Sequence, residues 1–200
     1  MIAAPERNAE RDAAIRAALP HVPFEGWTAR ALRAGLADLG EPVEIAGNLF
    51  PDGPVGMVEA WCDLADREME EAAGDLEGLG LTGRVRALIA LRLRRLRPHR
   101  EALRRALALL ARTGDARAAA RVTARTVDAI WHAAGDRATD FSWYTKRASL
   151  AAIYGATLLY WLADESEDEA ATLAFLDRRL AGLAAIGRLR RRCAPGRRAA

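Results

Sequence analysis

Apolar residues recur at helical spacing along almost the whole chain, and proline or glycine interrupts them at short intervals. A three-to-four-residue period buries one face of a helix, whereas the strict alternation that is typical of half-buried strands is rare here. Apolar residues make up 51% of the 200 positions, which is enough for a sizeable core. We therefore predict an all-α protein of about nine helices joined by short loops.

Capping residues, prolines and glycines set the limits of these helices. Thr28, Asp115, Ser142 and Ser166 can each cap a helix start, and the pair Pro20 and Pro23 ends the first helix. The predicted helices span residues 6–19, 28–39, 43–49, 55–73, 82–96, 100–112, 115–134, 143–163 and 166–192.

Three short helices followed by a long one are the order found in TetR-type repressors, where the first three form a helix-turn-helix head. The turn of that motif would lie between Leu39 and Val43. We predict a degenerate head over residues 1–52, a larger helical ligand-binding and dimerisation domain over 53–190, and a basic tail over 191–200.

The predicted recognition helix is unsuited to DNA. It carries Glu41, Glu44 and Asn48 but neither lysine nor arginine, and Asp38 and Asp52 flank it. Duplex DNA is bound chiefly by cations that displace counterions from phosphates, so these carboxylates oppose binding. We expect no nucleic-acid partner, and a head that packs on the rest of the chain or meets a protein.

The arginine-rich stretch from Arg84 to Arg112 alternates apolar positions with cations. We interpret it as a solvated arginine face, and the alternative is a contact with anionic lipid headgroups. The cations concerned are Arg84, Arg86, Arg92, Arg94, Arg95 and Arg97.

The most distinctive segment is Thr126–Tyr154, which reads TVDAIWHAAGDRATDFSWYTKRASLAAIY. Its Trp-His-Ala-Ala-Gly-Asp block and the following Asp-Phe-Ser-Trp-Tyr-Thr-Lys-Arg block resemble the signature of the coenzyme Q (ubiquinone) biosynthesis accessory family. Phe24-x-Gly26-Trp27-Thr28 and Phe175-Leu-Asp-Arg-Arg179 add to the resemblance, which covers about residues 10–185.

This resemblance implies a TetR-like homodimer that has lost DNA binding and is not an enzyme. It would bind isoprenoid or quinone lipid intermediates and present them to the di-iron demethoxyubiquinone hydroxylase. We expect it in the cytoplasm, peripheral on the inner face of the cytoplasmic membrane. Eukaryotic members carry a further membrane-docking amphipathic helix after the Phe-Leu-x-x-Arg segment, and we expect it to be missing or reduced here.

Two sets of candidate residues follow. The helical faces predict a lipid-binding sleeve of apolar side chains, and the aromatic and basic block predicts a surface for the hydroxylase. The sleeve comprises Met57, Val58, Trp61, Val127, Ile130, Trp131, Ile153, Tyr154 and Leu158, and the surface comprises Asp140, Trp143, Tyr144, Lys146 and Arg147.

No catalytic residue set, cofactor motif or metal-ligand set is expected. His132 lacks the three or four converging ligands that a metal needs, so we interpret it as a hydrogen-bonded or capping histidine. Two other functions stay open. One is a TetR-type transcriptional regulator, and the other is a lipid-binding adaptor without quinone specificity.

Overall fold

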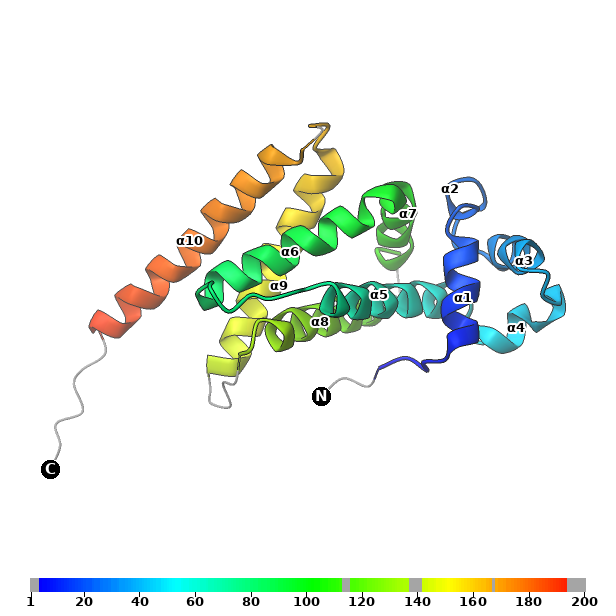
Figure 1. The fold of residues 1–200 in the computed structure, drawn as a ribbon, viewed down its shortest axis with the longest axis horizontal. Coiled ribbons are helices and arrows are strands. Elements are labelled where there is room, and N and C mark those ends of the chain that lie inside the picture. Colours follow the sequence, from blue (N-terminus) through cyan, green and yellow to red (C-terminus); the bar gives the residue numbers. More distant parts are fainter. Residues whose placement is uncertain (1–3, 113–115, 137–141, 167, 194–200) are drawn as a thin grey trace, which may run out of the picture. The chain divides into compact units, whose positions relative to one another are not determined.

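The computed structural model describes residues 4–112, 116–136, 142–166 and 168–193, with side chains except those of Ser142 and residues 183–193. Over these residues the chain forms ten α-helices, two of them four residues long, and two 3₁₀ turns, with no β-strand. The prediction of an all-α fold is confirmed. The helices are α1 (Ala9–Ala18), α2 (Val22–Glu25), α3 (Ala29–Asp38), α4 (Ala46–Leu49), α5 (Gly53–Glu71), α6 (Leu81–Leu96), α7 (Arg100–Leu110), α8 (Ala116–Ala133), α9 (Ser142–Ala163) and α10 (Ala170–Cys193); the turns are η1 (Val43–Ile45) and η2 (Arg97–His99) (Figure 1).

The chain divides into two compact units, residues 1–138 (unit 1) and 139–200 (unit 2). Unit 1 holds the predicted head together with the helices that follow it, because α1 packs on α5 and α2 packs on α7. Residue 52 is therefore not a boundary between compact units. A functional division at that position stays a prediction.

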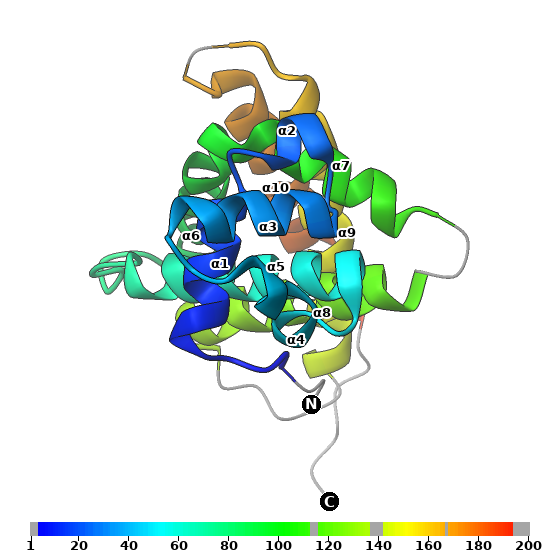
Figure 2. The same ribbon diagram turned by 90° about the vertical axis from the view of Figure 1, so that its right-hand side faces the viewer.

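The head has the predicted order α3, η1, α4 after α1 (Figure 2). Thr28 caps α3, since its hydroxyl oxygen accepts a hydrogen bond from the Ala31 N–H at 3.3 Å. Gly40, at φ 73°, supplies the left-handed residue after α3. The helix α3 crosses α1 so closely that a Cβ on Gly35 would lie 2.5 Å from the backbone nitrogen of Ala18. Glycine at this position permits the crossing.

One short helix was not predicted. We expected Pro20 and Pro23 to end the first helix, and Pro23 in fact lies in the first turn of α2. Proline is favoured there because its missing N–H has no partner in the first turn of a helix. Val22 is fully buried, so tertiary packing stabilises this turn.

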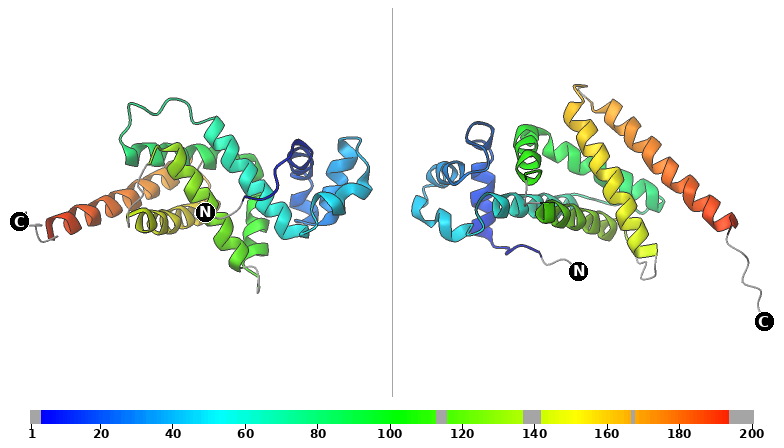
Figure 3. Two further views of the ribbon diagram at one scale, coloured as in Figure 1. Left: turned by 90° about the horizontal axis from the view of Figure 1, so that it is seen from below. Right: turned by 180° about the vertical axis from the view of Figure 1, so that it is seen from behind.

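The long helix α5 packs on both α6 and α8 in the rest of unit 1 (Figure 3). Its buried face includes the predicted Val58, Trp61, Leu64 and Met69. One expectation for α6 is wrong: Arg92 is 3% exposed and does not belong to a solvated face. Its Nε donates to Asp66 of α5 at 2.7 Å, and this buried partner compensates the charge.

In unit 2, α9 and α10 form a helical hairpin joined at one end, as the right-hand view of Figure 3 shows. The predicted cap Ser166 is wrong, because α10 begins four residues later, at Ala170. Asp164 instead accepts hydrogen bonds from the Thr172 N–H at 2.9 Å and from the Thr172 hydroxyl at 2.6 Å. The Trp161 indole donates to Glu169 at 2.7 Å, which ties α9 to the start of α10.

Among the residues that the structure describes, no helix is both long enough and apolar enough to cross a membrane.

Candidate functional site

Six of the nine predicted lipid-binding residues lie in unit 1, on the packed helices α5 and α8. All six are buried, with Trp131 the most exposed of them at 7%. Trp61 packs against Trp27, with ring centroids 5.1 Å apart. The helical spacing thus identified buried positions on α5 and α8, and their role in lipid binding stays a prediction. The six are Met57, Val58, Trp61, Val127, Ile130 and Trp131.

The other three, Ile153, Tyr154 and Leu158, lie on α9 in unit 2 and are also buried. Burial alone does not distinguish a core residue from a residue that lines a lipid-binding site, because both are buried. A common sleeve formed by all nine residues stays a prediction.

The predicted partner surface lies at the start of α9. Tyr144 is 68% exposed, although a large aromatic side chain usually finds cover in a protein interior. The Trp143 and Tyr144 rings meet edge to face with centroids 4.8 Å apart, and the Arg147 guanidinium stacks over Trp143 at 3.8 Å. The structure thus brings an exposed tyrosine, a half-buried tryptophan and a cation together. Lys146 lies half-buried in the same turn, and Asp140 lies outside the described residues.

Polar contacts that the sequence did not predict hold α5, α6 and α8 around the apolar face. Asp66 accepts a hydrogen bond on each carboxylate oxygen. Arg92 donates to one oxygen, and the Thr126 hydroxyl donates to the other at 2.9 Å. Burial raises the pKa of Asp66, and the Arg92 charge opposes that rise. Glu59 of α5 pairs with Arg121 and Arg125 of α8. The i, i+4 spacing of the two arginines was the available signal, but nothing in the sequence identified their acceptor.

Two residues with reactive side chains are in ordinary environments. Burial raises the pKa of the Cys62 thiol to about 12, so the thiol stays protonated at neutral pH. The His132 side chain is exposed, and its Nδ1 lies 3.3 Å from a Glu70 carboxylate oxygen. His132 is thus hydrogen-bonded, as predicted.

This arrangement of helices defines a class of protein, the TetR-like fold. The structure matches the crystal structure of a TetR transcriptional regulator from Nitrosomonas europaea with a TM-score of 0.70 and 25% sequence identity, covering 88% of this chain and 99% of that one. Within that class, residues 116–187 match the COQ9 family, and this range contains the whole Thr126–Tyr154 signature.

The chain is also similar in sequence to curated COQ9 proteins from several organisms. The chain is 35% identical to human "Ubiquinone biosynthesis protein COQ9, mitochondrial" over 83% of its own length and 55% of that protein. It is 34% identical to the COQ9-B protein of Xenopus laevis, over 86% of this chain and 62% of that protein. It is 30% identical to the protein of Dictyostelium discoideum named a probable ubiquinone biosynthesis protein, over 81% of this chain and 55% of that protein. The protein is therefore related to the COQ9 proteins, which confirms the predicted resemblance, and it spans little more than half the length of these human and Dictyostelium relatives.

Proposed function

We propose that the protein is an accessory factor of ubiquinone biosynthesis that binds an isoprenoid or quinone lipid and presents it to the demethoxyubiquinone hydroxylase. The observation that carries this proposal is the similarity to COQ9 proteins over 83% of the chain. The protein would act without catalysing the reaction itself, as a homodimer, peripheral on the inner face of the cytoplasmic membrane.

The buried face of α5 and α8 supports the lipid-binding step. A polyprenyl tail is too apolar to leave a bilayer unaided, since each buried methylene contributes about 0.8 kcal/mol. Apolar side chains such as Met57, Val127 and Ile130 offer the environment that such a tail needs.

The aromatic pair of half-buried Trp143 and exposed Tyr144 supports the presentation step. Tyr144 and Trp143, with Arg147 stacked beside them, have the composition of an interface centre rather than of a solvated helix start. Tyr144→Lys adds a charge to that centre, and the exposure of this side chain predicts an unchanged fold. We expect hydroxylase binding to fall by at least tenfold in a pull-down or titration. Leu159→Lys is the matched control, because Leu159 is also exposed, at 64%, and lies on the same helix outside the proposed surface.

Mass spectrometry of lipids extracted from the protein, purified from a ubiquinone-making host, tests the proposal directly. Enrichment of a prenylated quinone precursor is the expected result. Bulk phospholipid alone would favour the lipid-binding adaptor. Equal hydroxylase binding by Tyr144→Lys and wild type would reject the assigned surface.

A transcriptional regulator is the second candidate, since the matched Nitrosomonas structure carries that name. The acidic head argues against it. Glu44 and Asn48 are exposed on η1 and α4, where a DNA-reading protein needs cations.

A further inference from the structure

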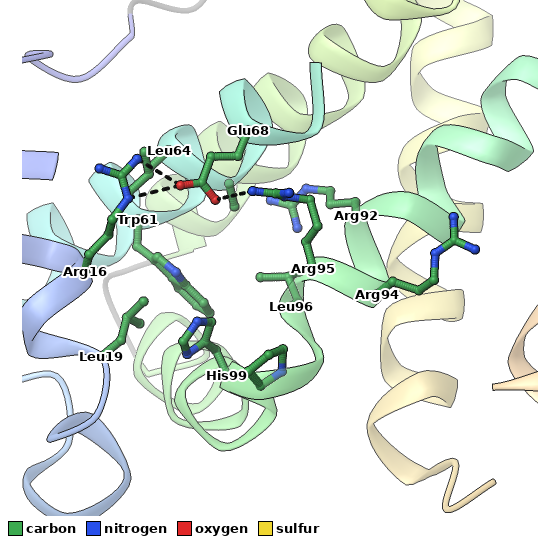
Figure 4. A pocket seen from close by; sticks show the side chains of 12 residues that line it. Arg16, Leu19, Trp61, Leu64, Glu68, Arg92, Arg94, Arg95, Leu96 and His99 are labelled. Carbon is green, nitrogen blue, oxygen red and sulfur yellow. Dashed lines mark hydrogen bonds and ion pairs between the residues drawn. The ribbon is translucent and has the colours of Figure 1, made fainter. Parts of the chain in front are cut away.

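A cavity of about 440 Å³ opens in unit 1 where α1, α5, α6 and η2 meet (Figure 4). Of the predicted lipid-binding residues, only Trp61 lines it. The volume is near the lower end of the range for small-molecule pockets, about 300–1,000 Å³. The cavity is thus a separate feature from the buried α5 and α8 face, and it suits a small ligand.

One part of the cavity wall is apolar and well fixed. Leu19, Leu64 and Leu96 line the cavity and are each exposed by 5% or less. Trp61 is held by its contact with Trp27, whose indole N–H donates to the Ala102 carbonyl at 2.9 Å. Such a wall is formed before any ligand arrives, which reduces the entropy cost of binding.

Two arginines meet one carboxylate at the rim. Arg16 donates to one oxygen of Glu68 through Nε at 3.2 Å and Nη2 at 2.9 Å, and Arg95 donates to the other oxygen at 3.2 Å. Figure 4 shows the two guanidinium groups reaching Glu68 from opposite sides. These side chains are partly exposed, so solvent and ligands can reach them.

The charges at this rim do not balance. Glu68 supplies one negative charge against the positive charges of Arg16 and Arg95. Arg94 also lines the cavity and adds a positive charge. Asp66 neutralises Arg92, and burial lowers the pKa of His99, so neither of these residues adds to the positive excess. A guanidinium has five donors in a planar fork, and Arg95 is shown using one of them on Glu68. One further carboxylate would balance the pair of arginines.

We propose that this cavity binds a small organic acid, with its carboxylate on Arg16 and Arg95 and its apolar body against Trp61, Leu64 and Leu96. The site is separate from the predicted lipid-binding residues, of which only Trp61 lines the cavity.

Calorimetric titration of the full chain with octanoate, 1-octanol and octyl phosphate tests the ligand class, because the three probes share one apolar chain. We expect one octanoate per chain, bound at least tenfold more tightly than 1-octanol. Equal affinity for octanoate and 1-octanol would overturn the role of the arginines. Tighter binding of octyl phosphate than of octanoate would overturn the assignment to a carboxylate.

Variants test the site. Arg16→Gln and Arg95→Gln should each weaken octanoate binding by about tenfold and leave 1-octanol binding unchanged. Arg104→Gln is the matched control, since Arg104 is a half-exposed arginine that pairs with Glu101 at 2.8 Å on α7, outside the cavity.

Glu68→Gln separates the proposal from a loss of fold. It removes the competing carboxylate, so octanoate affinity should rise by three- to tenfold, which misfolding cannot imitate. Unchanged or weaker octanoate binding by Glu68→Gln would overturn the proposal, as would unchanged binding by both arginine variants.

Discussion

Arg92 and Asp66 form an ion pair that is almost fully buried, and the Thr126 hydroxyl donates a hydrogen bond to the Asp66 carboxylate. Removing one member leaves an uncompensated charge in the core, which costs more than the pair itself contributes. We expect Asp66→Ala to lower the free energy of unfolding by about 3–5 kcal/mol in urea denaturation.

The exposed pair Arg104–Glu101 provides the comparison for that measurement. Its two partners are about half exposed, so Glu101→Ala should change the free energy of unfolding far less than Asp66→Ala does. The double variant Arg92→Met/Asp66→Leu should regain much of the free energy of unfolding that Asp66→Ala loses, because it leaves no unpaired charge in the core. Equal losses of free energy of unfolding in Asp66→Ala and Glu101→Ala would contradict a stabilising role for the buried pair.

Asp164 predicts a dependence of stability on pH. Hydrogen bonds from Ser166 and Thr172 hold the pKa of Asp164 below its ordinary value, so folding favours the ionised carboxylate. This stabilisation is complete above the pKa of an unfolded aspartate, about 3.9, and is lost as the pH falls through the lower pKa of the folded state.

We therefore expect Asp164→Ala to lower the free energy of unfolding by about 1–2 kcal/mol at pH 7, as for other lost caps. The difference from wild type should shrink as denaturation is repeated below about pH 4. Glu165→Ala, an exposed neighbour, should stay close to wild type at every pH. A difference that is constant with pH would show that the charge of Asp164 contributes nothing.

Arg92 and Asp164 also mark the limit of prediction from sequence. The helical period places Leu88 and Ile89 on a buried face, and they are buried, because apolar spacing is local information. The same period places Arg92 on this face, unlike its exposed neighbours Arg94 and Arg95. Its charge nevertheless suggested a solvated position, because the sequence does not show the buried partner Asp66.

The crossing of α1 and α3 depends on Gly35. A Cβ at this position would lie 2.5 Å from Ala18 N and 2.6 Å from Ala17 C, and backbone atoms inside a helix cannot move aside. Gly35→Ala should lower the free energy of unfolding by about 1–3 kcal/mol, even though alanine favours helix formation. Chemical denaturation gives the value.

Gly47→Ala is the control for that substitution. No heavy atom lies within 4 Å of a Cβ built at Gly47, which is exposed on α4. Alanine should be neutral or slightly stabilising at this site. If Gly35→Ala behaves like Gly47→Ala, the helices can separate without cost and the crossing is not fixed.

The helices were predicted to within a few residues where a local signal sets the end. Thr28 and Gly40 bound α3 as predicted. The start of α10 was wrong because Asp164 and Asp168 accept the hydrogen bonds of its first turn, from the N–H groups of Thr172 and Ala170. The signature block predicted the start of α9, but not the stacking of Arg147 on Trp143.

The chain as a whole combines a TetR-like fold with a head whose charges oppose DNA. The head cations are few, and Arg30 and His21 are paired with Glu25 and Asp38. The segment from Val43 to Leu49 contains no lysine or arginine. Protein affinity for DNA depends on the number of phosphates that cations neutralise, so little counterion release is available here.

Fluorescence anisotropy with duplex DNA from upstream of the protein's own gene checks this expectation. We expect no saturable binding below about 100 µM protein at physiological salt, the weak end of non-specific affinity. The variant Glu41→Lys/Glu44→Lys/Asp52→Lys changes three exposed carboxylates to cations, and it should gain affinity that falls steeply with added salt. Such a gain would show that the fold can still approach DNA and that charge excludes it. Tight, sequence-selective binding by the wild type would favour the transcriptional regulator over the accessory factor, because lipid presentation does not require a head that recognises a DNA sequence.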